Sequence, residues 1–204
     1  RVVSDRAQAN ALTLALLLGG SGCRMGAPKH RLRSQATGDS ILGHQARRMA
    51  PHFSALLLLH GPFEVSADLP GERVPDLEQY VGQGPLAALL AALQAASPPW
   101  VRLLAIDHPQ VPPALYEEAL SRGADLERAV VYLDENRKPQ WLCGLYHRGL
   151  IPELQNALKE GIRSMNRFWD DRPLLLLPCP SPEVFCNLNT REQALDSGWE
   201  VPDK

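Results

Sequence analysis

Short aliphatic runs alternate with helical segments along most of this chain, and this alternation constrains its fold more than any other feature of the sequence. A strand that is buried on both faces reads as a continuous aliphatic run, because neither face meets water. Such strands, alternating with helices, favour a parallel sheet between two layers of helices. We therefore expect an α/β fold with three layers, α/β/α, and strands at 12–18, 55–60, 100–106, 128–134, 140–146, 174–177 and 184–188.

Helical spacing and helix-start residues mark four segments between these strands. Asp39 or Ser40 can cap a helix whose apolar side chains follow on one face. Gly84 and Pro85 precede leucines at helical spacing, and proline is favoured at the first position of a helix. The other two helices are expected at 113–122 and 152–168.

The strands expected at 128–134 and 140–146 are separated only by a short polar turn. A parallel pair needs a crossover connection of a dozen or more residues, so this pair is expected to be an antiparallel hairpin. The sheet is then mostly parallel with one antiparallel element. At 204 residues, 45% of them hydrophobic, the chain can bury one substantial core, and we expect a single domain over residues 1–204.

Charge and apolar patterning argue against several classes of protein. The formal net charge is −2 and no long run of like charges occurs, so nucleic acid is not expected as a partner. The apolar runs are far shorter than the ~20 residues that cross a bilayer. The apolar stretch near the start is short and follows Asp5, which disfavours an export signal. We expect a cytoplasmic protein with no membrane partner.

The cysteines do not have the spacing of zinc ligands. They form no CxxC pair and have no histidine at metal-ligand spacing. Reduced thiols in a cytoplasmic protein are the simpler interpretation. The four residues are Cys23, Cys143, Cys179 and Cys186.

The first expected strand runs into a loop of small residues, GGSGCRMGAPK at 19–29. It is not a dinucleotide fingerprint, because Asp39, at the right separation, lies at a helix cap and not at the end of the second strand. It is not a Walker A loop, because no GK[ST] follows. Such a loop lets backbone N–H groups approach phosphate oxygens, while Arg24 and Lys29 neutralise their charge. The alternative is a glycine-rich turn with a solvated arginine and lysine.

Polar side chains follow the later strands as well. Asp107 ends the strand expected at 100–106, and Asn187 and Asn189 lie near the end of the last expected strand. Ligands of open α/β sheets bind outside the carboxyl ends of the strands, so these side chains should meet the first loop at one edge. Because strand side chains alternate, the two asparagine amides should point to the same side.

These motifs together resemble one known family. The segment LLGGSGCRMGAPK resembles the signature loop of the molybdenum cofactor guanylyltransferases, which have a Rossmann-like, nucleotide-diphospho-sugar transferase fold. Further matches follow in the same order and cover about residues 12–197, which we expect to be the core of the domain. They are Asp76, the GPLA motif at 84–87, Asp107 with Pro109, the WLCGLY segment at 141–146 and the FCNLNT segment at 185–190.

The resemblance implies transfer of GMP from GTP to the phosphate of molybdopterin or Mo-molybdopterin, with release of pyrophosphate. It implies Arg24, Lys29 and Asp107 as catalytic residues, with Asp107 binding Mg²⁺, and it places Asn187 and Asn189 near the pterin-bearing substrate. The asparagine that the family has after its second strand has no match here, and His60 is the nearest polar residue. The nucleotide-binding residues so implied are Leu17, Leu18, Gly19, Gly20, Ser21, Lys29, His60, Asp76, Gly84, Pro85 and Asp107.

The base and the activity leave alternatives open. Gly19-Gly20 and the GPLA motif resemble the guanine-specific form, whereas Pro28 before Lys29 is more typical of the cytidylyl relatives. A cytidylyltransferase or a sugar-phosphate nucleotidyltransferase is therefore an alternative. Departures at Leu18 and Pro28 and the missing asparagine also leave open a binding module for cofactor delivery that lacks catalysis. Contacts with other proteins that make or receive the molybdenum cofactor are also expected from the resemblance.

Overall fold

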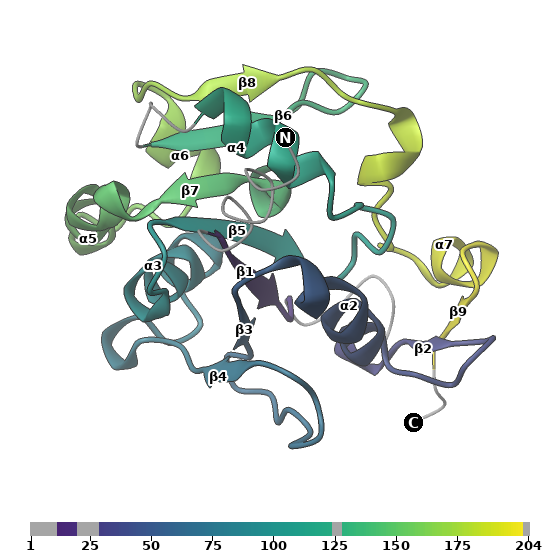
Figure 1. Cartoon of the computed structure of the whole chain (residues 1–204). Coiled ribbons are helices and arrows are strands. Elements are labelled where there is room, and N and C mark those ends of the chain that lie inside the picture. Colours follow the sequence, from purple (N-terminus) through teal and green to yellow (C-terminus); the bar gives the residue numbers. More distant parts are fainter. Residues whose placement is uncertain (1–11, 20–28, 124–127, 202–204) are drawn as a thin grey trace.

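A seven-stranded sheet forms the centre of the computed structural model, which describes residues 12–19, 29–123 and 128–201 (Figure 1). The strand order is β4-β3-β1-β5-β7-β6-β8. The strands are β1 (Leu12–Leu17), β3 (Ala55–Leu59), β4 (Glu72–Val74), β5 (Trp100–Ala105), β6 (Ala129–Tyr132), β7 (Leu145–His147) and β8 (Leu175–Leu177).

One strand of this sheet runs against the others. β7 is antiparallel to both of its neighbours, β5 and β6, while all the other neighbouring pairs are parallel. The connection between β6 and β7 contains turns and one 3₁₀ helix but no α-helix that could cross a face of the sheet, and the chain returns antiparallel. The expectation of a mostly parallel sheet with one antiparallel element is confirmed.

Helices cover both faces of the sheet. Along β1, Leu14 and Leu16 pack into one hydrophobic cluster and Ala15 into the other, because successive strand side chains point to opposite faces. The first cluster includes α2 (Ile41–Met49) and α4 (Leu115–Gly123). The second includes α3 (Pro85–Ala95), α5 (Ile151–Lys159) and α6 (Met165–Trp169). The expected α/β/α layering is confirmed.

The starts of two helices follow the sequence signals. Ser40, rather than Asp39, is the N-cap of α2, and its Oγ accepts a hydrogen bond of 3.0 Å from the Gly43 N–H. Gly84 is the N-cap of α3, with φ of 86°, and Pro85 follows as the first helical residue. A positive φ strains any residue with a Cβ, so glycine is suited to this turn.

Three expected elements are wrong. Residues 140–146 do not form one strand, because 141–143 turn in a 3₁₀ helix and β7 starts only at Leu145. Residues 184–188 form no strand, because a proline-initiated 3₁₀ helix occupies Pro182–Phe185. The helix expected at 152–168 is divided into α5 and α6, and Gly161 between them has φ of 81°, which a helix cannot contain.

Several short elements were not expected. β2 (Arg33–Ser34) pairs antiparallel with β9 (Trp199–Glu200), and α7 (Arg191–Asp196) precedes β9. Figure 1 shows α7, β9 and β2 close together, to the side of the main sheet. In the described residues, short 3₁₀ turns lie at Lys29–Arg31, Ala50–His52, Glu78–Tyr80, Trp141–Cys143, Arg148–Leu150 and Pro182–Phe185. In the described parts of the chain, no helix is long and apolar enough to cross a membrane.

Arg102, in the middle of β5, places a charge in the core. Its side chain is completely buried, and its guanidinium lies over the Tyr116 ring, with Cζ 2.9 Å from the ring centroid. None of its nitrogens has a hydrogen-bond partner among the described residues. Burial lowers the pKa of Arg102 to about 10, so the group is charged at pH 7.

We expect Arg102→Met to raise the free energy of unfolding by about 1–2 kcal/mol, because it removes a buried charge without ionic partners. The pKa of Arg102 in the folded state lies below its value in the unfolded state, so its buried charge destabilises the native protein fully below pH 10 and less above it. The gain in stability from Arg102→Met should follow the same pH dependence. Urea titrations at pH 7 will measure this gain in stability as a higher midpoint, provided that the dependence of the unfolding free energy on urea concentration is unchanged. Arg122→Met, at an exposed ion pair, is the control and should change stability by less than about 0.5 kcal/mol. A lower midpoint for Arg102→Met would show that the cation–π contact outweighs burial.

Candidate active site

Four neighbouring strands end at the same edge of the sheet and present the predicted residues there. β1 is the switch point of the topology, since the chain continues to β3 and β4 on one side of it and to β5 on the other. Backbone hydrogen bonds extend the parallel pairing just past the strands. They join Leu18 N to Leu59 O (3.2 Å), Ile106 N to Leu17 O (3.1 Å) and His60 N to Val74 O (3.3 Å). Switch points of this kind are where α/β sheets bind ligands.

A pocket of about 460 Å³ lies at this edge, within the size range of small-molecule sites. It gathers most of the residues that the sequence predicts to bind a nucleotide, although they come from separate parts of the chain. Those lining it are Leu17, Gly19, Lys29, His60, Asp76, Gly84, Pro85 and Asp107.

The remaining predicted residues are placed elsewhere or are not described. Leu18 is 1% exposed and packs in the core instead of lining the pocket. Asn187 and Asn189 do not line the pocket, but both reach Lys29. Gly20, Ser21 and Arg24 lie outside the described residues.

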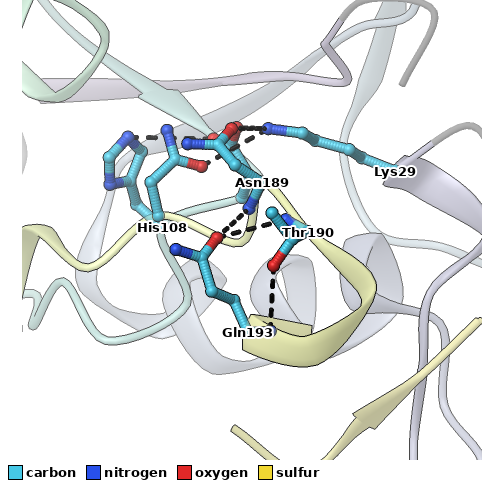
Figure 2. A network of polar contacts seen from close by, with 7 residues as sticks. Lys29, His108, Asn189, Thr190 and Gln193 are labelled. Atoms are coloured by element: carbon cyan, nitrogen blue, oxygen red, sulfur yellow. Dashed lines mark hydrogen bonds and ion pairs between the residues drawn. The ribbon is translucent and has the colours of Figure 1, made fainter. Parts of the chain in front are cut away.

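Lys29 is the centre of a polar cluster at one end of the pocket. Its Nζ makes an ion pair with Asp107 Oδ2 and donates to Asn189 Oδ1 at 2.8 Å and to Asn187 Oδ1 at 3.4 Å. Figure 2 shows the lysine reaching this cluster beside Asn189. The ammonium has three N–H donors, and all of them have a protein acceptor. Both asparagine amides therefore reach one point, although the segment that carries them is not a strand.

The two oxygens of the Asp107 carboxylate differ. Oδ2 faces Lys29, whereas Oδ1 is buried and accepts no hydrogen bond from the described residues. His108 Nε2 lies 3.8 Å from Oδ1, and burial lowers the pKa of His108, so the imidazole is neutral at pH 7. The carboxylate thus has one oxygen without a donor, which is a group that can bind a cation.

Among the described residues, Asp107 is the one carboxylate in the cluster around Lys29. The described residues contain no group of three or more His, Cys, Asp or Glu side chains that could hold a metal ion. A divalent cation at Asp107 would find further oxygen ligands in amide groups, in a substrate and in water. Mg²⁺ commonly binds in this way, through one or two carboxylates and substrate phosphates.

Asp76 lies at another part of the pocket, in the turn after β4. Its Oδ2 accepts a hydrogen bond of 2.8 Å from the Gly82 N–H, which fixes the carboxylate toward the loop before α3. The first turn of α3 follows at Gly84 and Pro85 and contains no acidic side chain. Its N–H groups have no partner within the helix and give this end a partial positive charge.

Sequence reasoning missed part of the lining. The turn after β3 contributes Gly61, Pro62 and Phe63, and Leu142 joins from the 3₁₀ turn that was expected to be a strand. Two histidines hold Phe63. His60 Nδ1 donates a hydrogen bond of 2.9 Å to its carbonyl, and the centroid of the His30 ring lies 4.5 Å from the centroid of the Phe63 ring. Gly61 and Pro62 directly after β3 were the sequence signal that could have indicated a turn at this edge of the sheet.

Comparisons with known proteins agree with this architecture. Residues 14–173 match the model of the MobA-like NTP transferase domain. A probable molybdenum cofactor guanylyltransferase of a Nostoc species is 30% identical over 90% of this chain and 88% of its own length. The protein of the same description from Deinococcus radiodurans is 31% identical over 87% of this chain and 89% of its own.

A solved structure supports the fold independently. The molybdopterin-guanine dinucleotide biosynthesis protein A of Archaeoglobus fulgidus superposes with a TM-score of 0.75 at 22% identity. The match covers 91% of this chain and 96% of the other. The two chains therefore share one fold over nearly their whole lengths.

Proposed function

Because this chain belongs to the MobA-like NTP transferase family, we propose that it transfers GMP from GTP to the phosphate of molybdopterin and releases pyrophosphate. The observation that carries the proposal is the pocket at the carboxyl edge. It gathers a glycine turn, a lysine and two aspartates. The curated relatives named as molybdenum cofactor guanylyltransferases match this chain over about nine tenths of its length, which supports the same substrates here.

In the proposed reaction, a phosphate oxygen of molybdopterin attacks the α-phosphorus of GTP. The new P–O bond forms as the bond to the bridging oxygen breaks, and both electrons of that bond leave with pyrophosphate. The attacking phosphate is already an anion, so no general base is required. Positioning and charge neutralisation are then the main tasks of the protein.

Lys29, Gly19 and Asp107 are proposed to surround the triphosphate. The backbone near Gly19 can approach phosphate oxygens closely, and Lys29 can move from its protein acceptors to the phosphates as a point charge. Arg24 is proposed as a second cation, from the part of the loop outside the described residues. Leu17, His60, Asp76, Gly84 and Pro85 are proposed to hold the nucleoside.

A magnesium ion is proposed at Asp107. Lys29, Asp76 and Asp107 are the described charged residues of the lining, and together they carry no excess of positive charge to balance a triphosphate. The Asp107 oxygen without a hydrogen bond fits a cation. When bound, Mg²⁺ would neutralise phosphate charge and help to orient the phosphates.

Asn187 and Asn189 are proposed to face the acceptor. Their amides lie beside Lys29 and Asp107, next to the nucleotide pocket rather than in it. An amide can both donate to and accept from a phosphate or pterin group. We also propose that the protein works in the cytoplasm, where unpaired thiols such as the described free cysteines persist. There it would contact proteins that make or receive the cofactor.

A transfer assay with each nucleotide tests the function. With molybdopterin and Mg²⁺, GTP should yield GMP-linked product and pyrophosphate, and CTP, ATP and UTP should each react at least about tenfold more slowly. Chelation of the metal should reduce the rate to background. Transfer of CMP but not GMP would instead favour a cytidylyltransferase, and GTP binding without transfer to any acceptor would favour a binding module.

A further inference from the structure

Gln193, in the first turn of α7, connects the helix to the polar cluster around Lys29. Its side-chain Oε1 accepts two hydrogen bonds, from the Asn189 N–H at 2.9 Å and from the Thr190 N–H at 3.1 Å. In return, Thr190 Oγ1 accepts from the Gln193 N–H at 3.2 Å. Figure 2 shows these bonds between the glutamine and the backbone just beside Asn189.

The Leu188 side chain, which is 2% exposed and packs in the core, anchors the segment that carries the two asparagines. Residues 186–189 belong to no helix or strand. Among the described residues, one backbone hydrogen bond holds them to the turn after β5, from the Leu188 N–H to the Asp107 carbonyl at 3.0 Å. The next two backbone N–H groups, of Asn189 and Thr190, bond to Gln193. Leu188 thus anchors the backbone on one side of Asn189, and Gln193 holds it at Asn189 and Thr190, from where the Asn189 amide reaches Lys29.

Lys29 and Gln193 are attached to the same small sheet. Lys29 lies in the 3₁₀ turn that precedes β2, and α7 is followed directly by β9. β2 and β9 are paired, and Trp199 of β9 is 5% exposed. The contact between Lys29 and Asn189 is thus fixed from both sides, through the β2–β9 pair on the lysine side and through Gln193 on the asparagine side.

We propose that Gln193 is a positioning residue, which holds the Asn189 amide against the Lys29 ammonium at the proposed active site. Glutamine at this position is an acceptor for two adjacent N–H groups, and alanine would leave both without a protein partner. The Asn189 amide would then lose its fixed place beside Lys29 and Asp107. The effect should fall on the acceptor side of the site, because Gln193 is not part of the nucleotide pocket.

Three variants separate positioning from helix stability. Gln193→Ala removes the acceptor, and Gln193→Glu restores an oxygen that can accept both N–H bonds. Thr190→Ala removes the other half of the cap, from Thr190 Oγ1 to the Gln193 N–H, but leaves the bond to Asn189 N–H in place. Gln193→Ala and Thr190→Ala should both lower the thermal midpoint, since each removes a cap hydrogen bond.

The first readout does not depend on activity. Amine acylation followed by mass spectrometry gives the modification rate of Lys29 relative to Lys159, an exposed lysine at the end of α5. Lys29, whose side chain is 14% exposed, should react more slowly than Lys159 in the native protein. In Gln193→Ala the relative rate of Lys29 should rise about fivefold, which is the size expected for the loss of a hydrogen-bonded support. In Gln193→Glu and Thr190→Ala it should stay within about twofold of the native protein.

The second readout is kinetic and rests on the proposed function. In Gln193→Ala, kcat/KM for the acceptor should fall about tenfold while the dissociation constant for GTP stays within twofold. Gln193→Glu should recover most of the loss. An unchanged Lys29 rate in Gln193→Ala, equal effects in Thr190→Ala, or no recovery in Gln193→Glu would overturn the inference. If the native protein transfers no nucleotide, the proposed function is wrong, and the acylation rates alone decide the role of Gln193.

Discussion

Asp107→Asn should reduce GMP transfer by about 10³-fold or more while leaving the fold intact. The substitution keeps the size and shape of the side chain but removes the charge that pairs with Lys29 and that is proposed to bind Mg²⁺. Loss of a carboxylate that binds the metal at a phosphoryl-transfer site removes several kcal/mol of transition-state stabilisation. Steady-state transfer with GTP and molybdopterin over a range of Mg²⁺ concentrations will measure it.

The Asp107 variant needs a control for folding. Its circular dichroism spectrum and urea midpoint should stay close to those of the native protein, since an amide still fits between Lys29 and His108. Asp39→Asn, in an exposed ion pair with Arg47, serves as a matched carboxylate control and should keep full activity. An Asp107→Asn protein that turns over at the native rate would disprove the metal assignment.

Lys29→Met should lower kcat by about 10²–10³-fold and weaken GTP binding. Methionine keeps much of the length of the side chain but removes the ammonium that is proposed to bind the phosphates of GTP. It also leaves Asp107 without its ion-pair partner, so that the site becomes more negative where a polyanion must bind. Single-turnover transfer gives the rate, and calorimetric titration with GTP gives the affinity.

A second lysine provides the comparison. Lys159→Met changes an exposed lysine at the end of α5 and should leave both the rate and the affinity unchanged. Lys29→Arg should recover only part of the activity, because a planar guanidinium cannot occupy the position of a compact ammonium among three acceptors. Native activity in Lys29→Met would mean that the triphosphate lies elsewhere.

The strand exits could be predicted because simple rules determine them. Aliphatic runs mark β1, β3 and β5, and parallel strands must end at one edge, so Gly19, His60 and Asp107 had to lie near one another. The roles given to these residues came from the resemblance to a family and not from the pattern itself. Asp76 is an example, because a carboxylate in a loop does not by itself indicate a residue that binds a nucleotide.

The rest of the site depends on contacts that no local pattern encodes. Leu18 belongs to the signature loop, but the alternation of β1 turns its side chain into the core. Residues 184–188 contain the apolar residues of a strand, yet Pro182 starts a 3₁₀ helix, and the asparagines meet through long-range contacts to Lys29 and Asp107. β2 and β9 are two residues long, so only their pairing in three dimensions reveals them.

The three protein acceptors around the Lys29 ammonium affect the thermodynamics of ligand binding. A free lysine on a surface samples many rotamers, and a ligand that immobilises it must overcome that loss of side-chain entropy. Here the loss has already occurred during folding, because Asp107, Asn187 and Asn189 hold the ammonium. If a phosphate binds Lys29 as proposed, its oxygens replace the protein acceptors of a cation that is already ordered.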